Sequence, residues 1–71
     1  MKKVIIENND LIFPTISLVQ SDKAKEILFL LTNPTISNME LFYITLKAFK
    51  YEIEDFKHGE TQVLVQCKRE G

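Results

Sequence analysis

Residues 27–32 read Ile-Leu-Phe-Leu-Leu-Thr and contain the longest uninterrupted apolar run of the sequence. Lys25-Glu26 precede this run, and Asn33-Pro34 follow it. A short apolar run without polar alternation is typical of a central strand that is covered on at least one face. We therefore predict a central strand here. Its side chains are expected to be largely buried on both faces, with Leu28 and Leu30 on one face and Phe29 and Leu31 on the other.

The same stretch also fits a helix that begins after Ser21 as its N-cap. The residues that would then share one apolar helical face are Ala24, Ile27, Leu28 and Leu31. In that case Val4–Ile6 and Leu11–Phe13 would pair as a hairpin, and the order of elements would be ββααββ. The strand interpretation instead predicts βαβαββ with a four-stranded mixed sheet. Both interpretations give one two-layer α+β sandwich over residues 1–71.

The N-terminal third contains a strand signal and a helix signal. Three consecutive β-branched residues within Lys3–Glu7 favour a strand, and residues 8–10, Asn-Asn-Asp, favour a turn. Further along, Ser17 and Gln20 have the spacing of a capping box. This spacing predicts a short helix over residues 18–25.

The second helix has a stronger start signal. Ser37 and Glu40 form a capping box, and Ile36 and Leu41 have the spacing of a hydrophobic staple. These residues predict a helix from Asn38 to about Phe49.

The apolar face of this second helix is wider than contact with one sheet requires. Its apolar residues are Met39, Leu41, Phe42, Ile44, Leu46, Ala48 and Phe49. Two explanations remain open. Either the first helix and the loops cover the excess, or part of it is a surface for a protein partner or a homodimer.

The last third reads as a β-hairpin. Residues 51–54 alternate between apolar and polar side chains, and Val63, Val65 and Cys67 alternate with Gln62, Leu64 and Gln66. This pattern of period two is typical of half-buried strands. Residues 57–60, Lys-His-Gly-Glu, are predicted to form the turn, with Gly59 supplying a positive φ.

Length and composition narrow the possible functions. The 71 residues suffice for one domain, and no apolar segment approaches the roughly 20 residues that span a membrane. One cysteine and one histidine allow no internal disulfide and no multi-cysteine metal site, so we expect a cytoplasmic protein without metal or cofactor. A net charge of −1 disfavours nucleic acid as a partner.

The predicted order of elements resembles that of the TusA-like (SirA/YedF-like) small sulfur-carrier proteins. Residues 30–33, Leu-Leu-Thr-Asn, and residues 50–54, Lys-Tyr-Glu-Ile-Glu, are similar to the family's V-D-N and G-Y-E-V-E segments on either side of its second helix. Residues 62–69 resemble the family's final strand with its basic end. The resemblance covers roughly residues 3–69 and implies a βαβαββ fold.

The first helix departs from the family pattern. The family's Cys-Pro-x-Pro motif places the sulfur-carrying thiol there, but residues 13–16 are Phe-Pro-Thr-Ile, so the proline remains and the thiol is absent. The resemblance implies candidate binding residues at Phe13, Pro14, Thr15 and Asn33. It does not imply sulfur chemistry at this position.

Cys67 is the single candidate nucleophile. Its alternation with Val63 and Val65 points the thiol inward, where it would be a small apolar side chain with a raised pKa. We therefore favour a non-catalytic protein-interaction or binding module on a TusA-like scaffold. The alternatives are a sulfur carrier that uses Cys67 and a nucleic-acid-binding domain.

Overall fold

The central strand of the fold is β2, Glu26–Thr32, as the apolar run predicts. The computed structural model describes residues 2–21 and 24–70, and the strands of its mixed sheet lie in the order β1-β2-β4-β3. β2 pairs in parallel with β1, Lys2–Ile6, and antiparallel with β4, Gln62–Arg69. The edge strand β3, Tyr51–His58, pairs antiparallel with β4.

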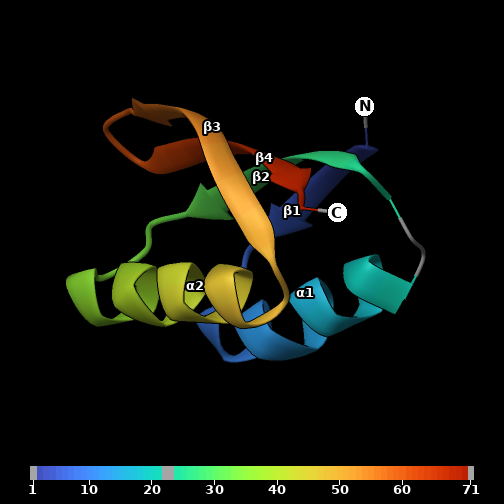
Figure 1. Cartoon of the computed structure of the whole chain (residues 1–71). Coiled ribbons are helices and arrows are strands. Elements are labelled where there is room, and N and C mark those ends of the chain that lie inside the picture. The colour runs from blue at the N-terminus through green and yellow to red at the C-terminus, as the bar shows by residue number, and fades with distance from the viewer. Residues whose placement is uncertain (1, 22–23, 71) are drawn as a thin grey trace.

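Two helices cover one face of the sheet (Figure 1). They are α1, Ile12–Ser21, and α2, Ile36–Ala48, and the chain order is βαβαββ. The fold is therefore the predicted two-layer α+β arrangement, and the alternative ββααββ order is wrong. Neither helix in the described ranges is long and apolar enough to cross a membrane.

The core lies between the helices and the inner face of the sheet. At its centre the ring of Phe29 on β2 meets the ring of Phe42 on α2 edge-on, with 5.3 Å between ring centroids. Both side chains are fully buried. The other buried apolar side chains are Val4, Ile6, Ile12, Ile16, Val19, Ile27, Leu31, Leu46, Tyr51, Val63, Val65 and Cys67.

The outer face of the sheet corrects one prediction about β2. Phe29 and Leu31 are fully buried as expected, but Leu28 and Leu30 are only half-buried. Both helices pack on the inner face, so the outer side chains are covered mainly by their neighbours in the sheet. Leu30 lies between its cross-strand partners Ile5 and Leu64, and this row of aliphatic side chains explains the unbroken apolar run.

The first helix begins earlier than its predicted capping box, so the prediction of residues 18–25 is wrong. A 3₁₀ turn, η1, Asn9–Leu11, leads directly into α1. The Asn8 side chain caps this turn by accepting a hydrogen bond of 2.9 Å from the Asp10 amide. Pro14 is tolerated in the first turn of α1 because its missing N–H is not needed there. Residues 22–23, within the predicted helix, lie outside the described ranges.

The buried side chains explain why the chain is helical before Ser17. Ile12, Ile16 and Val19 recur at helical spacing and fill the core beneath α1. Burial of this stripe outweighs a local capping signal, since a cap contributes only about 1 kcal/mol.

The second helix also begins earlier than predicted. Thr35, not Ser37, is the N-cap, and its hydroxyl accepts a hydrogen bond of 3.1 Å from the Asn38 amide. The expected staple does not form, because Ile36 is 82% exposed. Both Thr35 and Ser37 are competent caps. The Thr35 start places Phe42, Thr45 and Leu46 on the buried face of α2.

Replacing the cap should destabilise the protein measurably. We expect Thr35→Ala to lower the free energy of unfolding by about 0.5–2 kcal/mol, because the Asn38 amide loses its partner. Ser37→Ala is the matched control and should change it by less than about 0.5 kcal/mol, since Ser37 is exposed in the first turn. Chemical denaturation measures both variants. A larger loss in Ser37→Ala would show that the helix begins at Asn38.

The hairpin forms as predicted but with longer strands. β3 continues to His58, and its register with β4 shifts between Ile53 and Asp55, which marks a β-bulge. Gly59 does not have the expected positive φ. Its amide instead donates a hydrogen bond of 2.8 Å to the Gln62 carbonyl oxygen. A Cβ atom added to Gly59 would lie only 3.2 Å from the same oxygen, so a larger residue would fit tightly here.

Candidate binding groove

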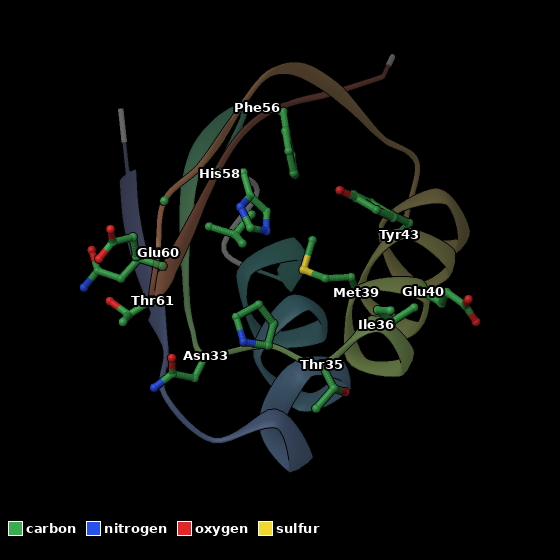
Figure 2. Close-up of a pocket in the computed structure, with 14 residues that line it drawn as sticks. Asn33, Thr35, Ile36, Met39, Glu40, Tyr43, Phe56, His58, Glu60 and Thr61 are labelled. Atoms are coloured by element: carbon green, nitrogen blue, oxygen red, sulfur yellow. The ribbon is translucent and has the colours of Figure 1, made fainter.

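A groove of about 480 Å³ opens between the first turns of α2 and the tip of the β3–β4 hairpin (Figure 2). Its walls come from two segments that are far apart in the sequence. The lining residues are Asn33, Pro34, Thr35, Ile36, Met39, Glu40, Tyr43, Phe56, His58, Gly59, Glu60, Thr61, Gln62 and Val63.

The β-bulge supplies one wall of this groove. Ile53 lies opposite Cys67, and after the bulge Phe56 and His58 lie opposite Val65 and Val63. Residues opposite one another in a sheet share a face, so Phe56 and His58 are on the helix side. Both are exposed nevertheless, and their rings lie 6.3 Å apart.

Helix α2 supplies the other wall. Met39 and Tyr43 are one turn apart on the same side of α2, and both are half-buried. In Figure 2 the Met39 side chain points toward His58, and the Tyr43 ring lies across the groove from Phe56. Aromatic and thioether side chains thus face one another across an open space. Such surfaces suit apolar ligand groups.

A backbone hydrogen bond fixes the end of the groove. The Asn33 amide donates to the Thr61 carbonyl over 2.7 Å, which ties the β2–α2 connection to the hairpin tip. Asn33 has a φ of 47°, a left-handed conformation that asparagine tolerates better than most residues. This link joins the two walls at one end.

The rim of the groove is acidic. Glu40 and Glu60 stand on opposite walls, and the lining includes neither lysine nor arginine. Burial raises the pKa of the Tyr43 phenol, with a smaller contribution from the nearby Cys67 thiol, so Tyr43 is neutral at pH 7. An acidic rim attracts positive charge.

Of the four candidate binding residues, only Asn33 lines this groove. Phe13, Pro14 and Thr15 lie at the start of α1, where the exposed Phe13 ring contacts the Phe49 ring at 5.6 Å between centroids. The structure does not bring Phe13 and Asn33 together in this groove.

The candidate nucleophile Cys67 is fully buried in β4, as its alternation predicts. Burial raises the pKa of the thiol to about 12, and the Glu54 carboxylate adds to this effect. Thiolate is the reactive form of cysteine, so we expect Cys67 to react slowly in this fold. Within residues 2–21 and 24–70, no three His, Cys, Asp or Glu side chains are grouped to hold a metal ion.

The sequence contains one signal for the groove. Tyr51 and Ile53 occupy odd positions, whereas Phe56 and His58 occupy even ones, and this change of phase indicates a bulge in a strand. The predicted turn at residues 57–60 ended the strand before His58, so the change of phase was not interpreted as a bulge.

The chain matches no protein-family model, no curated protein and no solved structure.

Proposed function

We propose that this chain is a non-catalytic protein-interaction module on a TusA-like scaffold. Its groove binds an extended segment of a partner protein that carries apolar side chains and at least one basic side chain. One observation carries this proposal: Met39, Tyr43 and Phe56 form an apolar groove with an acidic rim. A bulky apolar anchor within a charged rim is the usual anatomy of a binding site.

Two features support the TusA-like scaffold. The βαβαββ order agrees with the family pattern, and Pro14 lies in the first turn of α1. Phe13 takes the place of the family's thiol with an exposed apolar side chain. A TusA-like frame without the thiol is better suited to binding than to sulfur transfer. The cytoplasm remains our expected compartment for such a module.

The two alternative functions have less support. A sulfur carrier needs a thiol that a donor can reach, but Cys67 is buried and its pKa is raised to about 12. A nucleic-acid-binding surface needs clustered positive charge. The groove offers Glu40 and Glu60 at its rim instead.

Two side chains of rare residue types make the proposal testable by NMR. His58 is the only histidine of the chain, and Met39 is one of two methionines, so each gives a resolved signal from the groove. We would titrate short peptides of alternating leucine and arginine, and matched peptides with glutamate in place of arginine. The arginine peptides should shift the Met39 methyl and His58 imidazole signals saturably, because the rim is acidic.

Phe56→Ala should weaken this binding about tenfold, because it removes an aromatic anchor. Ile53→Ala is the matched control: Ile53 shares strand and face with Phe56, is 39% exposed against 43%, and does not line the groove. This control should bind as the unchanged protein does. Equal responses to both peptide series, or an equal loss in Ile53→Ala, would contradict the proposal.

A further inference from the structure

A second apolar surface lies on α2, where several apolar side chains are exposed. Leu41 is 44% exposed and Ile44 is 67% exposed, and Ala48 continues the same stripe one turn later. These residues recur at intervals of three and four, so they form one continuous face of the helix. The buried residues Phe42 and Leu46 lie on the side of α2 that faces the core, and the buried Thr45 lies between the two sides.

Two opposite charges border this stripe. Glu40 and Lys47 are both exposed, lie seven residues apart, and therefore share one side of α2 at a separation of two helical turns. The midpoint between them falls between Tyr43 and Ile44, half a residue from Ile44. Opposite charges thus lie at nearly equal distances on either side of Ile44, and so do the apolar residues Leu41 and Ala48.

We propose that this face binds a second copy of the chain, with the two α2 helices antiparallel about a two-fold axis beside Ile44. The two-fold axis brings Ile44 against Ile44 of the second copy. It also brings Leu41 against Ala48 of the second copy, and the small alanine side chain leaves room for the leucine.

Charge complementarity selects a second copy as the occupant. An antiparallel pairing about Ile44 brings Glu40 of each copy to Lys47 of the other, so one pair of opposite charges forms twice. A parallel pairing would instead place Glu40 against Glu40 and Lys47 against Lys47. Like charges at both ends disfavour that arrangement.

This interface goes beyond the proposed function and does not depend on it. Met39 and Tyr43 line the groove from another side of α2, whereas Leu41, Ile44 and Ala48 do not line it. Glu40 lies at the border between the two surfaces. Peptide binding by the Phe56→Ala variant therefore tests the groove, and the molecular mass of the chain in solution tests the interface.

Sedimentation velocity of the full chain over a range of concentrations tests the interface. We expect a reversible dimer with a dissociation constant in the micromolar range, because a contact between two helices is small. Ile44→Glu should give a folded monomer, since Ile44 is exposed in each single copy. A monomer at millimolar concentration of the unchanged protein, or a dimer that Ile44→Glu leaves intact, would overturn the proposal.

Charge exchange tests the antiparallel geometry. Glu40→Lys alone and Lys47→Glu alone should each weaken the dimer about tenfold, because each places like charges at both ends. An equimolar mixture of these two variants should form a heterodimer about as tight as the unchanged dimer. The double variant Glu40→Lys/Lys47→Glu should recover the homodimer as well.

Charge-matched controls use the sheet: Glu52→Lys and Lys57→Glu on β3 should leave the dimer unchanged. If the mixture associates no better than either variant alone, the antiparallel α2 pairing is wrong.

Discussion

Phe42→Ala should lower the free energy of unfolding by about 3–5 kcal/mol. The Phe42 ring is fully buried and meets the Phe29 ring edge-on at the centre of the interface between α2 and the sheet. Truncation removes this contact and leaves a cavity that the surrounding strands cannot close. A domain of 71 residues has a total stability of roughly 4–10 kcal/mol, so the variant should be partly unfolded at 37 °C.

Phe56→Ala is the control for this prediction. It removes the same side chain from the rim of the groove, where Phe56 is 43% exposed, and should lower the stability by about 1 kcal/mol or less. Urea denaturation followed by circular dichroism measures both variants. Equal losses would mean that Phe42 does not lie in the centre of the core.

The stability should fall steeply in alkali because of Cys67. Burial raises the pKa of its thiol from 9.0 to about 12 in the folded chain. The thiol is neutral in both states below pH 9. Above pH 9 the unfolded chain loses this proton and the folded chain keeps it, so the unfolded state becomes favoured. The loss should be about 1.4 kcal/mol per pH unit between pH 9 and about 12.

Cys67→Ala separates this effect from the other groups that titrate in alkali. The variant should be less stable at pH 7 because it leaves a small cavity, but its stability should fall less steeply above pH 9. The difference between the two pH profiles isolates the thiol. Parallel profiles, or rapid labelling of native Cys67 by a disulfide probe at pH 7, would show that the thiol is accessible.

The start of each helix shows where local sequence signals are insufficient. Residues 14–17 and residues 34–37 both read Pro-Thr-Ile-Ser. Each serine is a competent cap, yet Ser17 lies inside α1 and Ser37 lies inside α2. A cap contributes about 1 kcal/mol. Burial of Ile12 and Ile16 contributes more, so the position of the core decides where α1 begins.

The groove could not be predicted as a site because its walls belong to different layers. Asn33, the one candidate binding residue that lines it, ends up near Thr61 only because the hairpin tip folds back over the β2–α2 connection. The family resemblance directs attention to Phe13 and Pro14 instead. These residues lie at the start of α1 and do not line the groove.

The sequence by itself determined the α+β class and the inward position of Cys67, and it favoured the βαβαββ order over the ββααββ alternative. Each of these depends on the period of apolar residues within one segment, which is a local property. The tertiary structure alone decided the half-exposure of Leu28 and Leu30 and the placement of Met39 and His58 on facing walls of the groove. These features depend on which layer covers which face, and residues distant in the sequence settle that through packing.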